Sequence, residues 1–514
     1  MADERTLREG GGERGVARQK KLGRMTARER IAALQDDDAP LLELGLWAGW
    51  EMYPDAGGTV AAAGVVVAVT KVAGRDVMIV ANDATVKAGA FFPATAKKVL
   101  RAQTVAFNCN LPLIYLVDSA GVYLPMQDEV FPDEDDFGRI FRNNAVLSAA
   151  GVPQIAAVMG NCVAGGAYLP VLSDKMLMTK GSELYLAGPA LVKAAIGQDA
   201  DADALGGAEM HAAVSGTVDF LEEDDAACIK RLKSLISQLP RQPDAEAAAS
   251  RSERDPQAVY DLPLAAEYDV RDLLAPILDA GSLDEYKREY GQTLVCGYAK
   301  LAGHPVGVVA NQRKRVKTAN GEVQVGGVIY HDAADKAARF VMDCDQTGLP
   351  LLFFQDVAGF MVGTRSEQAG VIRSGAKLVN AVSNCRVPKI TTVVGGSFGA
   401  GNYALCGKAF DPTFIFAWPN AKYAVMGPGQ AAKTLVQLAK RQAERAGEEF
   451  DDAELTRQVT SEYEHKADIR YGAARGWVDA IIAPHETRDV LAHALSLATR
   501  PKPTGGFRGG VLQV

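Results

Sequence analysis

Short apolar runs alternate with amphipathic stretches along most of this 514-residue chain. The runs Leu113–Val117 and Gln154–Met159 are apolar on both faces, and each is followed by a turn of small residues. Between such runs, Ala96–Cys109 and Asp335–Asp343 show the hydrophobic period of helices. Strands that are apolar on both faces are covered by helices on both sides of a sheet. The pattern therefore predicts an α/β fold.

The same pattern occurs twice, in the same order. Leu111–Gly121 returns as Leu349–Gly359, with Asp118 matching Asp356. Further along, Asn161–Tyr168 matches Gly396–Tyr403, and Ser215–Asp219 matches Arg475–Asp479. Repeats of this length and order indicate an internal duplication.

A chain of this length exceeds the usual size of one hydrophobic core. We predict an N-terminal tail over 1–24 and two homologous domains over 25–260 and 261–514, joined by the polar segment 242–257. The second copy has extra residues around the basic loop 313–317 and a charged stretch between 430 and 465. We expect that stretch to form a solvated amphipathic helix.

The chain is mildly acidic, with 55 Lys+Arg, 63 Asp+Glu and a net charge of -8. This balance does not favour nucleic acid or an anionic membrane as a partner, so any polyanion must be bound by a local cluster. No apolar run reaches the length of about 18 residues expected of a membrane span, and Met1–Arg30 lacks the apolar core of a secretory signal. The seven cysteines are scattered, and the six histidines show no metal-ligand spacing. We expect a cytoplasmic protein with reduced thiols and no metal site of its own.

Both copies carry a small-residue turn where a strand is followed by a helix. The turns contain Gly165 and Gly166 after Ala164, and Ala400 and Gly401 after Phe398-Gly399. A minimal side chain lets a ligand oxygen approach successive backbone N–H groups, and the first turn of a helix leaves those groups without intrahelical acceptors. Each turn is therefore a candidate oxyanion hole, although a tight structural connection has the same sequence.

Other catalytic motifs are absent from the sequence. It contains no G-x-S-x-G, no phosphate-binding G-x-x-x-x-G-K-[ST] and no dinucleotide fingerprint with its acidic partner. Two anion-stabilising turns without an evident nucleophile suit a reaction that passes through enolates. Preorganised backbone dipoles would then provide most of the catalysis.

Basic and aromatic residues flank the predicted turns. Lys87, Lys97 and Arg101 border the first one, and a helical period places Lys97 and Arg101 on one face. They are either solvated charges or ligands for the phosphates of a nucleotide-tailed thioester. Apolar pockets have candidate walls in the aromatic side chains Phe91, Phe92, Tyr123, Phe360 and Tyr403, each of which also suits a plain core.

Several long segments resemble the carboxyltransferase (β) subunits of biotin-dependent acyl-CoA carboxylases, and most closely those of the 3-methylcrotonyl-CoA carboxylases. The similarity runs from about Gly23 to the C-terminus and is carried by Gly23–Arg30, Ile79–Lys87, Tyr115–Pro125, Val130–Asp133, Phe137–Arg139, Leu186–Lys193, Gly359–Gly363 and Gly399–Tyr403. The resemblance implies two tandem crotonase-like domains, each a ClpP/crotonase ββα spiral. It also implies transfer of a carboxyl group from carboxybiotin to an acyl-CoA enolate, without a side-chain general base.

The resemblance assigns roles to the two turns and their neighbours. In the first domain, Gly165 and Gly166 would hold the thioester oxygen of acyl-CoA. In the second, Ala400 and Gly401 would hold the ureido oxygen of biotin. The acyl-CoA site would also include Lys87, Lys97, Arg101, Ala164 and Tyr123, and the biotin site Phe360, Val362, Gly363, Phe398 and Tyr403.

The family also implies partners. Because the chain lacks an Ala-Met-Lys-Met biotinylation motif and a recognisable ATP-binding region, an α subunit would supply the biotin carboxylase and the biotin carrier. Each active site would form between the first domain of one copy and the second domain of another, in a hexamer built as a trimer of dimers.

Two departures from the family pattern leave the substrate open. This chain has Pro428-Gly429-Gln430 where methylcrotonyl-type enzymes have Gly-Glu-Gln, and its 315–325 loop is longer. We expect 3-methylcrotonyl-CoA, while propionyl-, acetyl- and geranyl-CoA remain open. So does a role as the carboxyltransferase subunit of a sodium-pumping decarboxylase or a transcarboxylase. A silent scaffold for a biotin-bearing partner is a further alternative, disfavoured by the intact turns in both copies.

Overall fold

The computed structural model describes residues 2–239, 250–264, 266–318, 321–427, 433, 435–437, 439–441, 452–501 and 510–511. They form two compact units. The first unit comprises Met1–Pro243 with Ala474–Gly476 and Arg500–Val514. The second unit comprises Asp244–Ala473 with Trp477–Thr499.

The units differ from the predicted domains in several places. Ala474–Gly476 and Arg500–Val514, predicted to lie in the second domain, belong to the first unit. Residues 250–260 belong to the second unit, where Ser252 pairs with Asp279 and the Tyr260 hydroxyl lies 2.7 Å from His485 Nδ1. The predicted N-terminal tail contains the helices α1 (Ala2–Arg8) and α2 (Gly12–Lys21). Between them the backbone N–H of Gly11 donates to Thr85 Oγ1 at 3.0 Å, so this segment is packed on the first unit.

The first unit is built on a sheet in the order β1-β2-β3-β4-β5-β6-β8, with β7 pairing beside β6 on β5. Its strands are β1 (Leu42–Leu44), β2 (Val65–Val72), β3 (Arg75–Asn82), β4 (Leu113–Ser119), β5 (Gln154–Val163), β6 (Lys175–Thr179), β7 (Glu183–Tyr185) and β8 (Phe220–Glu222). The first three strands are antiparallel, and from β3 onward neighbouring strands are parallel. The sheet is therefore mixed.

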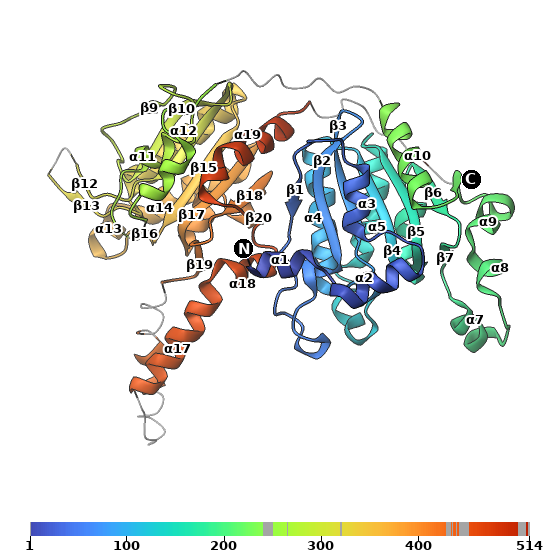
Figure 1. The fold of residues 1–514 in the computed structure, drawn as a ribbon. Coiled ribbons are helices and arrows are strands. Elements are labelled where there is room, and N and C mark those ends of the chain that lie inside the picture. Colours follow the sequence, from blue (N-terminus) through green and yellow to red (C-terminus); the bar gives the residue numbers. More distant parts are fainter. Residues whose placement is uncertain are drawn as a thin grey trace. The chain divides into compact units, whose positions relative to one another are not determined.

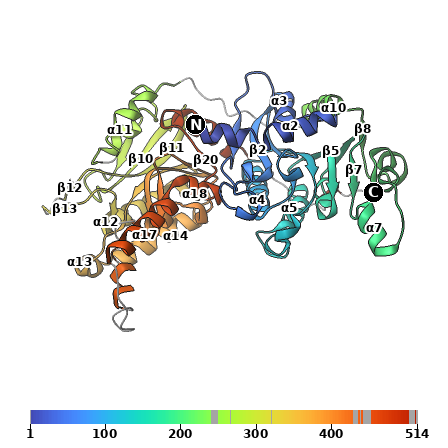
Figure 2. The ribbon, with the colours of Figure 1, turned by 60° about the horizontal axis from the view of Figure 1, so that its bottom comes forward.

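Helices cover both faces of this sheet (Figures 1 and 2). The helices α3 (Ala27–Leu34) and α10 (Asp225–Ser237) share a core with one face. The helices α4 (Pro93–Asn108) and α5 (Phe137–Ala149) lie on the other. Short helices follow, in the order α6 (Tyr168–Val171), α7 (Pro189–Ile196), α8 (Ala202–Gly206) and α9 (Ala208–Met210). Because both faces are covered, the central strands are apolar on both sides, as the sequence predicts.

The second unit has a sheet in the order β20-β18-β17-β15-β11-β10-β9, with β19 pairing on β17. Its strands are β9 (Asp284–Tyr286), β10 (Leu294–Leu301), β11 (His304–Asn311), β15 (Leu351–Val357), β17 (Lys389–Phe398), β18 (Phe414–Ala417), β19 (Lys422–Ala424) and β20 (Ala480–Ile481). Two small ladders join β12 (Val316–Lys317) to β13 (Val323–Gln324) and β14 (Val328–Ile329) to β16 (Gly359–Phe360). Its described helices are α11 (Val270–Leu274), α12 (His331–Thr347), α13 (Thr364–Gln368), α14 (Val371–Asn384), α15 (Ala400–Ala404), α17 (Asp452–Ala467), α18 (Ile469–Ala474) and α19 (Thr487–Ala498).

The two sheets have the same topology. Taken from β9, the second order repeats the first strand for strand, with the same two antiparallel and subsequent parallel pairings. The extra strands β7 and β19 pair with the equivalent strands β5 and β17. The α/β prediction is confirmed, and the repeated sequence motifs occupy matching places in the two units.

Three other sequence predictions concern the solvated helix, the reduced cysteines and the absence of a membrane span. The helix α17, within the charged stretch, is largely exposed and extends away from the sheet of its own unit, as predicted for a solvated helix (Figure 1). All seven cysteines are buried and free. Among the described residues, none of the helices combines the length and the apolar character needed to cross a membrane.

A buried lysine on α4 supports a strained turn in the first unit. Lys98 Nζ donates to the carbonyl oxygens of Ala62 and Val65 at 2.9 and 2.6 Å. Ala62 and Ala63 are left-handed, with φ of 49° and 54°. The lysine therefore donates to carbonyl oxygens of a turn whose left-handed alanines are unfavourable by themselves. Burial lowers the pKa of Lys98 to about 7.

This pKa predicts a pH dependence of stability. A lysine in the unfolded chain has a pKa of about 10.4, so between pH 7 and 10 the unfolded state binds more protons and the free energy of unfolding rises with pH, by roughly 4 kcal/mol from this group. Lys98→Met should remove that rise. Thermal unfolding followed from pH 6.5 to 10 tests it, with the exposed neighbour Lys97→Met as the control. Parallel pH curves for wild type and Lys98→Met would contradict the prediction.

Candidate active site

Each sheet carries the same irregularity in its two central strands. One residue of β4, Asp118, lies opposite residues 159–161 of β5. One residue of β15, Asp356, lies opposite residues 394–396 of β17. Such bulges bend a strand locally and redirect the chain that follows it. Here each bulge precedes one of the predicted turns.

A left-handed residue follows each bulged strand. Ala164 comes directly after β5 with a φ of 58°, and Gly399 comes directly after β17 with a φ of 54°. The chain then enters a 3-10 turn over Ala164–Ala167 in the first unit and the helix α15 in the second. The predicted pairs Gly165–Gly166 and Ala400–Gly401 therefore occupy equivalent positions, where N–H groups at the start of a helical turn lack intrahelical acceptors.

The first turn is bordered by the loops that leave β3 and β4. A Cβ added to Gly121 would lie 3.0 Å from the carbonyl oxygen of Val163, so this loop contacts the turn directly. The nearest atom to a Cβ added at Gly166 is Phe137 Cζ, at 4.0 Å. Phe137 packs against Phe91 with ring centroids 4.6 Å apart. Gly166 is itself buried, but a Cβ added to it would have room beside apolar rings.

The second turn is held more tightly. A Cβ added to Gly401 would lie 2.5 Å from Val357 Cγ2, so this glycine is needed for packing against β15. Sequence reasoning attributed its small size to ligand approach, whereas the structure supplies a packing reason. The preceding residue, Ala400, is exposed. It is the member of the pair that faces solvent.

A hydrogen-bonded chain fixes the second turn to both of its strands. The Asn402 amide donates to Ser397 Oγ at 2.7 Å, Ser397 donates to Gln355 Oε1 at 2.6 Å, and Gln355 donates to the carbonyl oxygen of Leu405 at 2.7 Å. The matching positions in the first unit are Val117, Cys162 and Ala167, which carry no such polar side chains. The two turns thus share a backbone path and differ in how they are held.

The structure distributes the other predicted acyl-CoA residues over two regions. Lys87 is exposed, and Tyr123 stacks on Phe92 with centroids 4.3 Å apart. Both lie in the loops that leave β3 and β4, and Ala164 lies in the turn itself. Lys97 is exposed on the first half of α4, and Arg101 is half-buried one turn later. Their neighbour Lys98 is buried, and so is not available as a surface phosphate ligand.

Charge reversal tests whether Lys97 and Arg101 hold phosphate. If they do, the double variant Lys97→Glu/Arg101→Glu should raise the KM for acyl-CoA about tenfold with little change in kcat, because phosphate contacts remote from the reacting atoms contribute uniform binding. Steady-state kinetics at fixed ionic strength measures this. The control is Lys230→Glu, which reverses an exposed charge on α10. An unchanged KM would mean that the two residues do not bind the phosphates of the thioester.

The predicted biotin residues differ in how exposed they are. Val362 is 77% exposed and Tyr403 is 49% exposed. Gly363 has a φ of 108°, which favours glycine. The ring of Phe360 lies against α14, where a Cβ added to Gly375 would be 3.1 Å from it, and that of Phe398 folds over Gly396. The last two rings therefore pack within the second unit, and both residues stay partly exposed.

The basic loop of the second copy is accounted for by ion pairs. Arg313 Nε lies 3.1 Å from Asp356 Oδ2, Lys314 pairs with Asp269, and Arg315 Nε lies 2.6 Å from Glu267 Oε1. Each of these three cations thus has an acidic partner within its own unit. The other departure from the family pattern, Pro428-Gly429-Gln430, lies outside the described residues.

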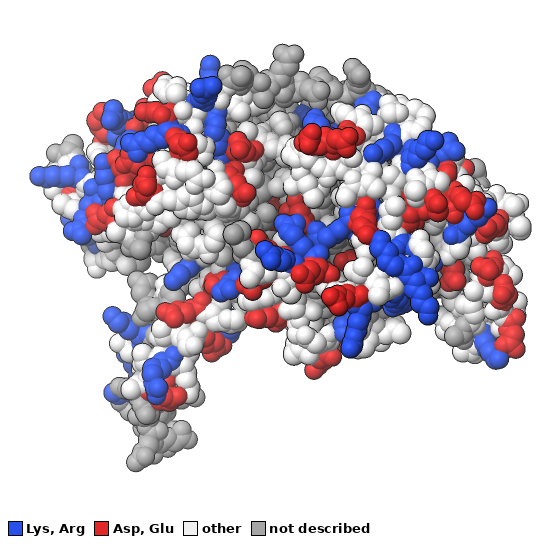
Figure 3. Space-filling view, viewed as in Figure 1, with Lys and Arg blue, Asp and Glu red and all other residues white. Residues whose placement is uncertain are grey.

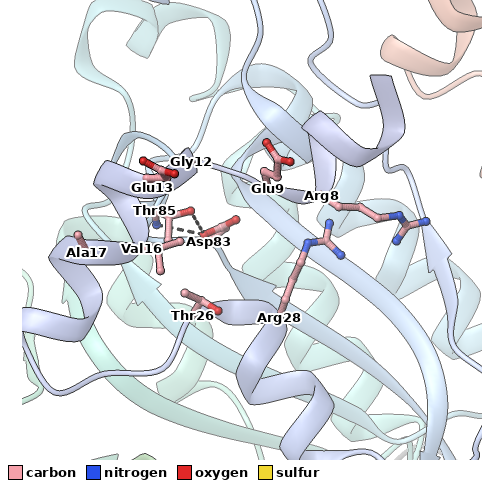
Figure 4. A pocket seen from close by; sticks show the side chains of 10 residues that line it. All are labelled: Arg8, Glu9, Gly12, Glu13, Val16, Ala17, Thr26, Arg28, Asp83 and Thr85. Atoms are coloured by element: carbon pink, nitrogen blue, oxygen red, sulfur yellow. Dashed lines mark hydrogen bonds between the residues drawn. The ribbon is translucent and has the colours of Figure 1, made fainter. Parts of the chain in front are cut away.

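A further pocket, of about 660 Å³, lies under the N-terminal helices (Figure 4). Arg8 and Arg28 stand at one side of it, and Gly12, Asp83 and Thr85 at the other. Both arginines pair with Glu43. The face of the molecule in Figure 3 shows acidic and basic side chains interspersed, in keeping with the mild net charge.

Sequence reasoning quoted Asp118 and Asp356 as part of the repeat but assigned them no role. Both are buried, and burial raises the pKa of each carboxyl although nearby arginines oppose the rise. The signal that was available is a charged residue at the end of an otherwise apolar strand, present in both copies. Their arginine partners, Arg30 and Arg313, come from distant segments, which no local pattern reveals.

The family follows from comparison with known proteins. The model of the carboxyl transferase domain matches residues 18–504, nearly the whole chain. The chain belongs to the carboxyl transferase family. The resemblance inferred from the sequence is thereby confirmed, and the chain is an enzyme.

Curated relatives of this carboxyltransferase match it almost end to end. It is 43% identical to the "Biotin-dependent 3-methylcrotonyl-coenzyme A carboxylase beta1 subunit" of Mycobacterium tuberculosis, over 95% of this chain and 91% of the relative. It is 41% identical to the mitochondrial "Methylcrotonoyl-CoA carboxylase beta chain" of Dictyostelium discoideum, over 97% of this chain and 84% of the relative. A solved structure, the β subunit of geranyl-CoA carboxylase from P. aeruginosa, superimposes with a TM-score of 0.87 at 34% identity, covering 99% and 94% of the two chains.

Proposed function

We propose that this carboxyltransferase is the β subunit of a biotin-dependent acyl-CoA carboxylase, with 3-methylcrotonyl-CoA as its substrate. The observation that carries the proposal is the pair of equivalent turns, one per unit, in a chain that is similar over nearly its full length to methylcrotonyl-type β subunits. The shared sheet topology supports the further proposal that both units are crotonase-like.

Each of the two turns binds the oxygen of a different substrate. In the first unit, Gly165 and Gly166 offer backbone N–H groups to the thioester oxygen of the acyl-CoA. A Cβ added to Gly166 would meet nothing nearer than 4.0 Å, which leaves room for that oxygen. In the second unit, Ala400 and Gly401 offer theirs to the ureido oxygen of biotin, and Ala400 is exposed at that point. Biotin, when bound, supplies the carboxyl group. The residues of this chain fit that role because they provide amide donors rather than a nucleophile or a metal ligand.

The chemistry requires stabilised negative oxygen. Loss of a proton from the acyl-CoA places negative charge on the thioester oxygen, and amide donors fixed in advance stabilise it without having to reorganise. The apolar rings of Phe91 and Phe137 beside the first turn exclude water, which strengthens those hydrogen bonds. In a conjugated thioester the nucleophilic carbon is the γ carbon, so the apolar space must extend beyond the α position.

Exposed apolar side chains support assembly with other subunits. In the first unit Leu191 and Ile196 stand out on α7, and in the second unit Val362, Ile372 and Val425 stand out near the turn. Exposed apolar side chains that gather into one patch are typical of surfaces that bind protein. We propose that copies of this chain form a hexamer, a trimer of dimers, in which each active site joins the first unit of one copy to the second unit of another. An α subunit would carry biotin and the biotin carboxylase.

Cellular location stays a prediction. The sequence favours the cytoplasm, while the Dictyostelium relative is named as mitochondrial. The transfer step is the same in either compartment.

A panel of acyl-CoAs tests the proposed function. The purified β subunit, combined with its α subunit, should fix bicarbonate with the highest kcat/KM on 3-methylcrotonyl-CoA, compared with propionyl-, acetyl- and geranyl-CoA. A preference for geranyl-CoA, the substrate named for the P. aeruginosa structure, would replace the proposed substrate. Inactivity on all four thioesters by a complex that still carboxylates its biotin would overturn the function.

A further inference from the structure

We propose that Asp118 and Asp356 are positioning residues, each of which, together with an arginine from outside its strand pair, holds the bulge that aims a catalytic turn. This inference rests on the proposed function, since it takes the two turns to be the sites of negative oxygen. It assigns a role to a pair of buried carboxylates that the proposed reaction does not use directly.

In the first unit, Asp118 holds β5 at its bulge. Its Oδ1 accepts the backbone N–H of Asn161 at 3.2 Å. A Cβ added to Gly160 would lie 2.1 Å from the carboxyl carbon, so the glycine at this position of β5 makes room for the carboxylate. The anchored residue, Asn161, comes three positions before Ala164. The turn therefore starts from a fixed point.

The charge of Asp118 is balanced by a buried arginine. Arg30, from α3, donates to Asp118 Oδ2 at 3.3 Å and to the carbonyl oxygen of Met159 at 2.8 Å. Its Nε donates to Asp225 at 2.9 Å, on α10. Arg24 stands 3.9 Å from the other oxygen of Asp118. Arg30 thus contacts both the carboxylate and the bulged strand, and links them to the helices on that face of the sheet.

In the second unit, Asp356 holds the bulge of β17 in the same way, but its side-chain partners come from other segments. Asp356 Oδ1 accepts the backbone N–H of Gly396 at 2.8 Å, and Oδ2 accepts the Tyr268 hydroxyl at 3.0 Å. A Cβ added to Gly395 would lie 2.3 Å from Oδ1. The anchored residue again comes three positions before the left-handed residue, here Gly399.

The arginine of the second unit comes from the basic loop. Arg313 Nε lies 3.1 Å from Asp356 Oδ2, as an ion pair without the alignment of a hydrogen bond. A Cβ added to Gly327 would lie 2.1 Å from Arg313 Nη1, so the loop backbone is packed closely around this side chain. One copy therefore draws its arginine from an N-terminal helix and the other from the loop inserted after β11. Both units therefore have the arginine–aspartate pair, although the arginine comes from a different segment in each.

This repetition is hard to explain by packing alone. A buried carboxylate carries a desolvation cost that an apolar residue would avoid. Two copies that have exchanged polar for apolar residues around their turns both keep the carboxylate, the glycine opposite it and an arginine. The carboxylate, the glycine and the arginine all serve to hold one backbone N–H group of the bulge in place. A shift of the following turn by about 1 Å is enough to reduce catalysis about 100-fold.

Asp118→Asn and Asp356→Asn test this role. They should change different KM values, which a general loss of stability would not do. The assay is transfer from a carboxylated acyl-CoA to free biotin, the reverse of the proposed reaction, measured on the purified oligomer. Asp118→Asn should raise the KM for the thioester at least tenfold and leave the KM for biotin within twofold. Asp356→Asn should do the opposite. Both should lower kcat, by about 100-fold for a 1 Å displacement.

A matched pair of arginines keeps the test decisive if an aspartate variant does not fold. Arg313→Gln, at a partly exposed side chain, should reproduce the biotin-specific rise in KM, and Arg313→Lys should recover part of it. Arg315→Gln, two residues on in the same loop and paired with Glu267, should change neither constant. If Asp118→Asn and Asp356→Asn reduce only kcat, or raise both KM values together, the positioning role is wrong.

The outcome separates this inference from the function on which it rests. Normal KM values in the aspartate variants, with activity lost when the turns themselves are altered, would remove the positioning role and leave the turns as the site. Full activity in the turn variants described below would remove the proposed site whatever the aspartates do.

Discussion

Gly166→Val should abolish carboxyl transfer, lowering kcat at least 1000-fold while the oligomer and its thermal stability persist. The structure makes this a clean substitution, because the backbone at Gly166 is not left-handed and its nearest neighbour to an added Cβ is Phe137 Cζ at 4.0 Å. The branched side chain would fill the space proposed for the thioester oxygen and separate that oxygen from its amide donors. Loss of such donors costs about 100- to 1000-fold each.

The measurement is carboxylation of 3-methylcrotonyl-CoA by the complete complex, alongside size-exclusion chromatography and thermal unfolding. Gly138→Val is the matched control, since a Cβ there meets nothing nearer than 3.8 Å and Gly138 adjoins the same Phe137. Activity within tenfold of wild type in a folded Gly166→Val enzyme would remove this turn from the site.

Ala400→Pro should lower kcat about 100- to 1000-fold by deleting a single N–H group. Ala400 is the first residue of α15. At that position the N–H has no intrahelical acceptor, and proline is the residue that the position tolerates best. The substitution therefore removes the proposed donor to the ureido oxygen while leaving the helix intact. Gly401→Val would be a poor choice here, because it would collide with Val357.

Ala400→Ser is the control for that experiment, since it adds a side chain and keeps the N–H. Transfer to free biotin and thermal unfolding, measured on both variants, separate catalysis from folding. A folded Ala400→Pro enzyme with near-normal kcat would show that this amide does not contribute.

The two variants can also be combined in one oligomer. When equal amounts of Gly166→Val and Ala400→Pro chains are coassembled into dimers, half of the dimers are mixed, and one of the two sites in each mixed dimer has two intact turns. About a quarter of the wild-type activity should then return if sites are shared between copies. No recovery in verified mixed oligomers would contradict shared sites.

Much of the fold could be predicted because it depends on periodicity and repetition. The repeat of Leu111–Gly121 at Leu349–Gly359 placed equivalent strands in both halves, and the structure confirms the same strand order in each. The turns at Gly165 and Ala400 followed from small residues after apolar runs. These signals are local in sequence, and sequence reasoning reads local signals well.

What could not be predicted depends on which way a side chain points and on distant partners. Lys97 and Lys98 are adjacent, yet only Lys98 is buried, where it binds the carbonyl oxygens of Ala62 and Val65. A signal was present, since Lys98 falls in line with the buried Ala94 and Ala102 at helical spacing. The packing role of Gly401 could not be predicted either, because Val357, which fills the space beside it, is 44 positions away. Tertiary packing decides such cases.

The hydrogen-bonded chain through Gln355, Ser397 and Asn402 has a consequence for redesign of this enzyme. A hydrogen-bonded network of side chains tolerates little substitution, which suits the proposed binding of biotin, a group that is the same for every acyl-CoA. Its counterpart in the other half is made of Val117, Cys162 and Ala167, whose replacement by other apolar side chains would leave no donor or acceptor stranded. Directed evolution toward new thioesters should therefore concentrate its diversity there.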